Sequence, residues 1–318
     1  MSDLTSKAQF PAEAGKDGGF VRQPYNIRGR ITADGSSGFP AEAGRYHLYV
    51  CYACPWAHRA IIVRKLLGLE DVISMSAVDP IRDERGWAFR EGNGHGPDPV
   101  NGFQFLSEAY LQTDPTFTGR YTVPVLWDRV TGKLVTNNYP DITIDMETQF
   151  GAFHKPGAPD LYPQALRSEI DEINEIVYRD VNNGVYRAGF ATAQEAYEAA
   201  VDQLFTRLDW LEDRLSRQRY LVGDQLTEAD IRLFTTLVRF DMVYVGHFKC
   251  NLRRLVDYPS LWAYARDLYQ RPGFGETVNE DHIKRHYYMT HDQINPTRIV
   301  PKGPVIDWTE PHGREALG

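Results

Sequence analysis

The chain has 318 residues, of which 42% are hydrophobic and 12% aromatic, and this is enough apolar material for the cores of two domains. Its formal net charge of -8 at pH 7 leaves no basic excess to neutralise phosphates, which argues against a nucleic-acid partner. The sequence shows neither an apolar membrane span nor a secretory signal, and its three cysteines cannot form a disulfide framework, so we expect a cytoplasmic protein.

The first half of the chain predicts a small α/β domain that follows an irregular arm. Residues 1–42 are rich in Gly, Pro, Ser and charge and show no sustained period, which is typical of an arm. From Arg45 onwards, "RYHLYVC" predicts a strand, "WAHRAIIVRKLLGL" a helix and "DVISMSAVD" a second strand. After a Gly-rich insertion near residues 80–121, "TVPVLWD" and "GKLVTNN" predict a strand pair, and a helix follows over residues 139–150. We place this domain at residues 43–152.

The second half predicts an all-α domain over residues 160–285. Helical periodicity is visible in "LRSEIDEINEIVYRDV", "AQEAYEAAVDQLFTRLDWLEDRLS", "TEADIRLFTTLVRFDMVYV" and "YPSLWAYARDLYQ". Within it, "LTEAD" predicts a helix start at which Thr227 is the N-cap and Asp230 completes a capping box. Residues 286–318 lose the periodicity but keep many aromatic side chains, so we expect an ordered tail.

The stretch "VCYACPWAHRAI" contains the candidate nucleophile. Cys54 precedes Pro55, which suits the first helical turn, so Cys54 is expected at the N-cap, where unpaired N–H groups favour a thiolate. In a thioredoxin-type C-x-x-C motif the resolving cysteine follows the attacking one by three positions, but here that position is Ala57 and Cys51 lies upstream. We therefore interpret Cys54 as a monothiol nucleophile that a small external thiol resolves. A merely buried cysteine and a Cys51–Cys54 disulfide are the alternatives.

The remaining cysteine, Cys250 in "HFKCN", is interpreted as a packed core residue. Three cysteines without a second C-x-x-C motif cannot build a structural zinc site. The sequence therefore predicts no metal.

Six blocks of the sequence resemble the Xi class of glutathione transferases, the glutathionyl-hydroquinone reductases. They are "YACPWAHR", "TVPVLWD", "NNGVYRAGFA", "RYLVGDQLTEAD", "RFDMVYVGHFKCN" and "HYYMTHDQINPTRIVP", and the match extends over residues 20–304. The resemblance implies a thioredoxin-like N-terminal domain, a helical C-terminal domain and normally a homodimer. It also implies that Cys54 attacks the sulfur of an S-conjugated hydroquinone, forms a mixed disulfide and releases the hydroquinone, before a second thiol regenerates the enzyme. A lone thiolate agrees with such a route.

The resemblance also implies which residues hold the thiol. Trp87, in "RGWAF" of the insertion, matches the tryptophan that lies along the bound thiol, with an ordinary surface aromatic as the competing interpretation. Val123 precedes Pro124 in "TVPV", where thioredoxin-like folds have a cis proline, a bond that is otherwise uncommon. The backbone of Val123 is expected to pair with the cysteinyl part of the thiol.

Three tyrosines match the hydroxyl groups that the family places at its acidic substrate site. They are Tyr186 in "NNGVYRAG", Tyr244 in "DMVYVG" and Tyr287 in "RHYYM". A leaving hydroquinone develops phenolate charge that O–H donors stabilise, and one tyrosine could protonate the ring carbon or oxygen. Because the chain has 18 tyrosines, each match alone is also compatible with simple packing. His247 and His291 lie near these motifs and are interpreted as hydrogen-bond partners.

The chain departs from the Xi pattern after its fourth predicted strand. The family usually reads asparagine, glutamate, serine, serine there, and its Glu–Ser pair binds the γ-glutamyl end of glutathione, whereas "TNNYPDITI" has Asn138 and Tyr139 at these positions. We therefore expect weak binding of glutathione. A sugar thiol such as mycothiol suits an amide and a phenol better, and the arginine-rich composition is compatible with an actinobacterial source. Alternatively, Asp141 or a residue of a partner subunit supplies the missing charge.

The sequence as a whole predicts a homodimeric enzyme that removes a low-molecular-weight thiol from S-conjugated hydroquinones. Glutathione or mycothiol is the expected co-substrate, with mycothiol favoured. An omega-type thiol transferase or deglutathionylase is the first alternative, although a Cys in place of Ser or Tyr at the helix start argues against conjugation. A non-catalytic binding module with the transferase fold is the second alternative, and the joint presence of Cys54, Pro55 and the three tyrosines argues against it.

Overall fold

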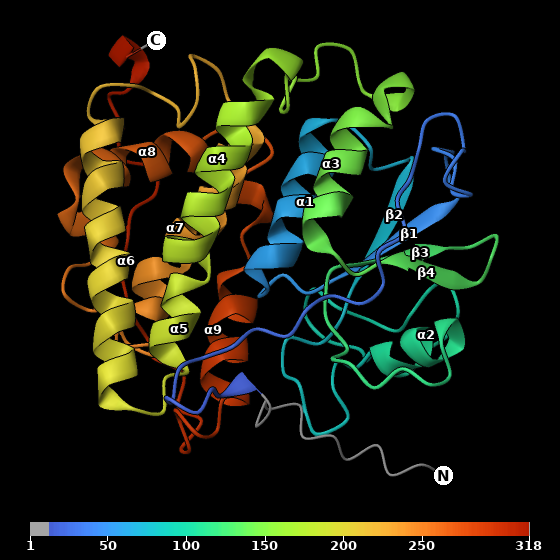
Figure 1. The fold of residues 1–318 in the computed structure, drawn as a ribbon, viewed down its shortest axis with the longest axis horizontal. Coiled ribbons are helices and arrows are strands. Elements are labelled where there is room, and N and C mark those ends of the chain that lie inside the picture. Colours follow the sequence, from blue (N-terminus) through green and yellow to red (C-terminus); the bar gives the residue numbers. More distant parts are fainter. Residues whose placement is uncertain (1–12, 318) are drawn as a thin grey trace. The chain divides into compact units, whose positions relative to one another are not determined.

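The computed structural model describes residues 13–317, and the chain forms two compact units (Figure 1). The described part of the first, the thioredoxin-like unit, consists of residues 23–159 and 279–292. The described part of the second, the helical unit, consists of residues 13–22, 160–278 and 293–317. The predicted arm is therefore divided between the two units, and its first twelve residues lie outside the described part of the chain.

A four-stranded sheet forms the centre of the thioredoxin-like unit. Its strands are β1 (Tyr46–Val50), β2 (Ile73–Ala77), β3 (Val125–Asp128) and β4 (Lys133–Thr136), in the order β2-β1-β3-β4. β1 pairs in parallel with β2, where Val50 lies opposite Ala77, and in antiparallel fashion with β3, where Leu48 lies opposite Leu126. Every side chain of β1 is buried, because both faces of the sheet are covered.

The helices of this unit are α1 (Pro55–Leu66), α2 (Leu106–Thr113), α3 (Tyr139–Thr148) and α9 (Glu280–Thr290). α1 and α3 pack side by side (Figure 1). Alternate residues of β1 point to opposite faces, and Tyr46 meets Phe150, just beyond α3. On the other face, Tyr49 packs on Phe89 of the insertion and donates a hydrogen bond to Asp98. The predicted insertion therefore covers one face of the sheet.

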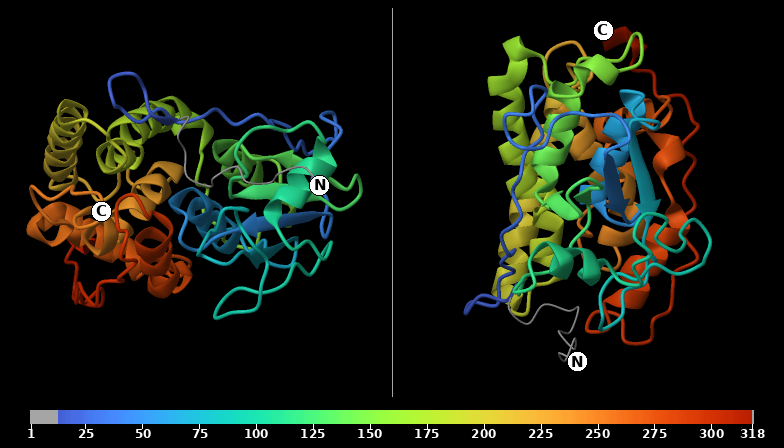
Figure 2. Two further views of the ribbon diagram at one scale, coloured as in Figure 1. Left: turned by 90° about the horizontal axis from the view of Figure 1, so that it is seen from below. Right: turned by 90° about the vertical axis from the view of Figure 1, so that its right-hand side faces the viewer.

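The helical unit contains α4 (Arg167–Val177), α5 (Gly184–Gly189), α6 (Gln194–Leu215), α7 (Glu228–Arg239) and α8 (Pro259–Tyr269). α5 packs along α6, the longest helix of the described chain, and Figure 2 shows α6 as the yellow helix in two further views. π-helical turns follow α4 and α7, over Tyr178–Asn182 and Phe240–Tyr244. The predicted fold class is confirmed. None of the helices in residues 13–317 is long and apolar enough to span a bilayer.

The end of the chain differs from the prediction. The expected boundary between residues 285 and 286 falls inside α9, and α9 belongs to the thioredoxin-like unit and not to a tail. Most buried positions of the helix are polar or aromatic and not aliphatic: His282, Ile283, His286, Tyr287, Tyr288 and Thr290. The aliphatic stripe from which helices are usually predicted is therefore weak.

Candidate active site

Cys54 lies where the sequence predicts it, at the N-cap of α1. Its backbone is extended (φ -77°, ψ 118°), Pro55 begins the helix, and the Cys54 N–H donates to the Cys51 carbonyl at 3.0 Å. The thiol Sγ lies 3.4 Å from the Val123 carbonyl oxygen, and the residue is 9% exposed. Because a helix N-terminus favours negative charge, this position suits a thiolate nucleophile.

The other two cysteines lie in less reactive surroundings. All three cysteines are free thiols, so Cys51 and Cys54 are not joined. Cys51 is fully buried, and burial together with the neighbouring Cys54 raises the pKa of its thiol to about 12. Burial likewise raises the pKa of Cys250, whose Sγ lies 3.8 Å from the Phe248 carbonyl oxygen. At neutral pH, Cys51 and Cys250 are therefore thiols with little nucleophilic character.

The loop before β3 presents a backbone carbonyl to Cys54. The Val123–Pro124 peptide bond is cis, and Val123 is buried. The Val123 carbonyl oxygen lies within hydrogen-bond distance of the Cys54 sulfur. The structure thus brings together Cys54, Val123 and Pro124, three of the predicted site residues.

Trp87 is buried among polar groups and is not an ordinary surface aromatic. The residue is 4% exposed, and its ring stacks on His286 of α9, with ring centroids 5.2 Å apart and planes 20° apart. The guanidinium carbon of Arg82 lies 4.9 Å from the centre of the same ring. His286 also contacts Tyr287 and His291, with centroid distances of 5.2 and 5.5 Å. α9 therefore brings Tyr287 next to a side chain that touches Trp87.

Asn138 and Tyr139 begin α3, but they have different surroundings. Asn138 is the N-cap residue, and its side-chain amide donates to Asp141 at 2.7 Å. Asp141 also pairs with Arg30 at 3.5 Å. Tyr139 is 5% exposed, packs on Trp56 and lies under the guanidinium of Arg59 at 5.0 Å, so its ring serves as packing material.

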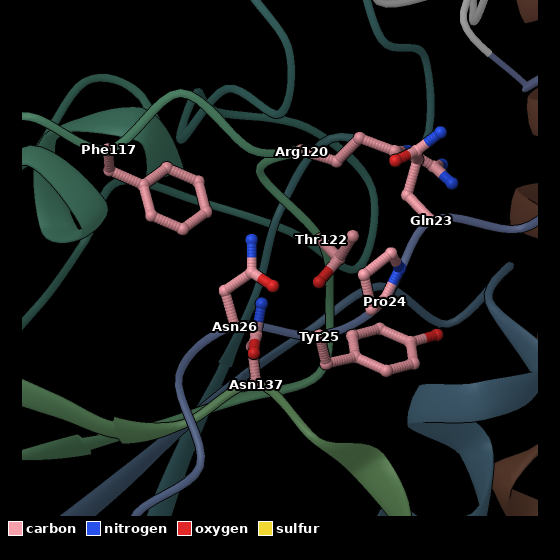
Figure 3. Close-up of a pocket in the computed structure, with 8 residues that line it drawn as sticks. All are labelled: Gln23, Pro24, Tyr25, Asn26, Phe117, Arg120, Thr122 and Asn137. Atoms are coloured by element: carbon pink, nitrogen blue, oxygen red, sulfur yellow. The ribbon is translucent and has the colours of Figure 1, made fainter.

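A polar pocket adjoins these positions along the chain (Figure 3). It is lined by Gln23, Pro24, Tyr25, Asn26, Phe117, Arg120, Thr122 and Asn137. Thr122 and Asn137 directly precede Val123 and Asn138. Figure 3 shows the Asn26 amide and the Thr122 hydroxyl turned toward each other. The lining is mostly amide, hydroxyl and aromatic, and Arg120 adds a positive charge.

The helical unit brings together the two other predicted tyrosines. The rings of Tyr186 on α5 and Tyr244 at the end of a π-helical turn lie 6.1 Å apart, and both contact Phe248. The guanidinium carbon of Arg22 lies 5.0 Å from the centre of the Tyr186 ring. His247 is buried beside Phe248, and burial lowers its pKa to about 4, so it is neutral at physiological pH.

Sequence reasoning did not identify Arg82 and His286. The only local signal for either was its position, His286 next to Tyr287 in "RHYYM" and Arg82 at the start of the insertion. Within residues 13–317, no three His, Cys, Asp or Glu side chains gather in a way that could hold a metal ion.

Comparisons with known proteins identify the family. Residues 53–149 match the model of the glutathione S-transferase N-terminal domain, and residues 194–267 match that of the C-terminal domain. The chain is 52% identical over 305 residues to the glutathionyl-hydroquinone reductase YqjG of Escherichia coli strain K12, a match that covers 94% of this chain and 93% of that protein.

Two solved structures agree with this match. The Xi glutathione transferase of Phanerochaete chrysosporium is 50% identical with a TM-score of 0.88, over 92% of this chain and 99% of that one. The glutathione-bound structure of Escherichia coli YqjG is 51% identical with a TM-score of 0.89, over 94% and 97% of the two chains. This chain therefore belongs to the Xi class of glutathione transferases, the glutathionyl-hydroquinone reductase family.

Proposed function

We propose that this protein is a thiol-dependent reductase that removes a low-molecular-weight thiol from S-conjugated hydroquinones. The observation that carries the proposal is a cysteine at a helix N-cap, Cys54, which is 9% exposed and whose cysteine neighbour Cys51 is fully buried with a raised pKa. Because the raised pKa of Cys51 makes it a poor resolving thiol, a mixed disulfide at Cys54 is best resolved by an external thiol. The name of the Escherichia coli relative, glutathionyl-hydroquinone reductase, supports the same reaction.

The proposed reaction has two steps. The Cys54 thiolate attacks the sulfur of the aryl thioether, so that an S–S bond forms while the aryl C–S bond breaks. The electron pair of the broken bond passes to the ring, whose carbon takes up a proton, and the free hydroquinone leaves. A second thiol then attacks the mixed disulfide as its thiolate, which restores Cys54 and gives a symmetrical disulfide. The conjugate is reduced, and two thiol units are oxidised.

The three predicted tyrosines are proposed to serve the leaving hydroquinone. A phenol O–H can donate a hydrogen bond to the oxygen on which charge develops, or give a proton to the ring. The pairing of Tyr186 with Tyr244 supports this role, since two hydroxyl-bearing rings lie together in the helical unit. Tyr287 is the third donor, held in the thioredoxin-like unit by α9.

Mycothiol is the thiol that we favour over glutathione. Asn138 offers an amide where the family usually has a carboxylate for the γ-glutamyl ammonium, and the Asp141 carboxylate is already occupied by Asn138 and Arg30. The adjoining pocket presents amide and hydroxyl groups, which match the hydroxyl groups of a sugar.

We also propose that the protein works as a cytoplasmic homodimer. The resemblance to the Xi class supports this assembly. Sedimentation equilibrium of the purified protein at micromolar concentration should give twice the 36.3 kDa chain mass. A mass of one chain would contradict the dimer.

The test of the function uses menadiol conjugated to either thiol. The wild-type protein should release menadiol from the S-mycothiolyl conjugate faster than from the S-glutathionyl conjugate, and intact mass should show one thiol added at Cys54. Cys54→Ser should show neither, whereas Cys250→Ser, a change at another buried cysteine, should retain both. Turnover by Cys54→Ser, or no adduct on the wild-type protein, would overturn the function. Turnover of the glutathionyl conjugate alone would overturn only the choice of thiol.

A further inference from the structure

The loop that contains Arg82 begins next to the cysteine pair because of the strand order. β1 and β2 are parallel neighbours, so the residues that follow them leave the sheet at the same end, where both strands have their C-termini. The Val78 N–H donates to the Val50 carbonyl at 2.9 Å, one residue beyond the end of β2. Residues 51–54 and residues 79–82 therefore start side by side.

The loop that contains Arg82 makes two contacts with His286 of α9. The Nδ1 atom of His286 lies 2.7 Å from the Pro80 carbonyl oxygen, and the His286 ring stacks on Trp87. The Arg82 guanidinium lies over the same Trp87 ring, at 4.9 Å. Such a stack orients the planar guanidinium. The position of Arg82 is thus set by Trp87 and, through it, by His286.

The charge of Arg82 reaches the Cys51 thiol, three residues before Cys54. Burial raises the pKa of this thiol, the charge of Cys54 reinforces the effect, and the positive charge of Arg82 opposes it with a smaller contribution. Arg82 and Cys54 therefore both lie within electrostatic reach of the same buried sulfur.

The other ionisable groups nearby come from three elements. α1 contributes His58 and Arg59, and Arg59 lies over Trp56 and Tyr139. α9 contributes His286, Tyr287 and His291. In the insertion, the Asp79 carboxylate pairs with Arg90 at 3.2 Å, which offsets its negative charge.

We propose that Arg82 stabilises the thiolate of Cys54, and that Trp87 and His286 are positioning residues for its guanidinium. The inference deepens the proposed function, since it rests on Cys54 being the nucleophile. It adds to the helix N-terminus a second source of positive potential at the sulfur, supplied by a different segment of the chain. Trp87 thereby has a positioning role besides the thiol contact that the resemblance to the Xi class implies.

The test follows the alkylation of Cys54 by the neutral reagent iodoacetamide between pH 5 and pH 9, with the modified peptide identified by mass. Arg82→Met keeps the length of the side chain and removes the charge, so we expect alkylation about tenfold slower at pH 6 and a rate midpoint about one pH unit higher. Arg82→Lys keeps the charge and should retain most of the rate.

The matched control is Arg85→Met. Arg85 belongs to the same loop and also lies over an aromatic ring, at 4.5 Å from Phe105, but it pairs with Asp83. Its loss should leave the profile unchanged. His286→Leu should shift the profile in the direction of Arg82→Met, because Arg82 then loses its support.

An unchanged midpoint in Arg82→Met would overturn the proposal, and so would an equal shift in Arg85→Met. If Arg82→Met fails to fold, the comparison of Arg82→Gln with Arg82→Lys separates the same two outcomes. The measurement needs no hydroquinone conjugate. A protein that shows the shift but turns over no conjugate would therefore contradict the proposed function alone.

Discussion

Asn138 is the residue at which thiol choice is most directly testable. Replacing Asn138 with Glu restores a carboxylate where the family usually has one. A charge-assisted hydrogen bond to a buried ammonium is worth roughly 1.5–3 kcal/mol, so we expect the glutathione dissociation constant to fall about ten- to hundredfold. Isothermal titration calorimetry of the purified protein measures this directly.

Asn138→Gln is the control, because it has the length of Glu without the charge. The new carboxylate would face Asp141, which now accepts a hydrogen bond from the Asn138 amide. Asn138→Glu combined with Asp141→Asn removes that repulsion and should show the larger gain. Equal affinities for the Glu and Gln variants would show that this position does not meet the γ-glutamyl ammonium.

His47, in β1, should make stability depend on pH. Its ring nitrogens lie 2.7 and 2.8 Å from the hydroxyls of Ser74 and Ser76, and burial, with a smaller contribution from Arg129, lowers its pKa to about 4. An unfolded histidine takes up a proton near pH 6.5. Between these values the unfolded state binds more protons, so the stability present above pH 6.5 is lost as the pH falls toward 4.

The expected loss from this one group is about 3 kcal/mol when complete below pH 4, and about 2 kcal/mol of it occurs between pH 7 and pH 5. Urea unfolding at pH 7, 6 and 5 should show a smaller pH dependence for His47→Gln than for the wild type, because both proteins retain the other histidines. Parallel stability curves for the two proteins would show that His47 is not the group responsible.

At the scale of elements, the start of α7 depends on one buried carboxylate. The predicted capping box is confirmed: Asp230 accepts from the Thr227 N–H at 2.9 Å. The same side chain accepts from the Leu221 N–H at 2.9 Å and from the Tyr264 hydroxyl at 2.8 Å. Asp230→Ala would leave these donors buried without an acceptor, and we expect a loss of about 3 kcal/mol in the free energy of unfolding.

Asp213→Ala is the comparison for this prediction. Asp213 is an exposed carboxylate on α6 that pairs with Arg217 one turn away, and solvent screens such a pair so that it adds little to stability. Urea unfolding should therefore show a much larger loss in the free energy of unfolding for Asp230→Ala than for Asp213→Ala. Similar losses would mean that the buried donors find other acceptors.

Elements with a local signal could be predicted from the sequence, and the others could not. Strand propensity followed by Pro55 marks the β1–α1 junction, and with it Cys54. α2 and α5 are short, with 8 and 6 residues, so neither gives a full amphipathic pattern.

The residues of the candidate site can also be divided into those with a local sequence signal and those without one. Val123 and Pro124 have a recognisable local motif, whereas His286 acts through a contact with Pro80 that spans 206 positions of sequence. No spacing or propensity encodes such a contact. It depends on the return of α9 to the thioredoxin-like unit, which in turn determines where Arg82 and Tyr287 lie.

At the scale of the whole molecule, the described chain passes between the units four times, after residues 22, 159, 278 and 292. Neither unit is therefore a continuous stretch of chain. α9, which completes the thioredoxin-like unit, is tied at both ends to segments of the helical unit. Unfolding of one unit releases the anchors of the other, so we expect the two to unfold together.

Two buried thiols report this coupling, since Cys51 lies in the thioredoxin-like unit and Cys250 in the helical unit, both fully buried. In increasing urea, both should become open to alkylation over the same concentration range. Asp230→Ala acts on the helical unit, yet it should lower the urea midpoint for Cys51 as much as that for Cys250, because the units share their stability. If only Cys250 became reactive at a lower urea concentration in this variant, the two units would unfold independently. The four chain crossings would then not couple their stabilities.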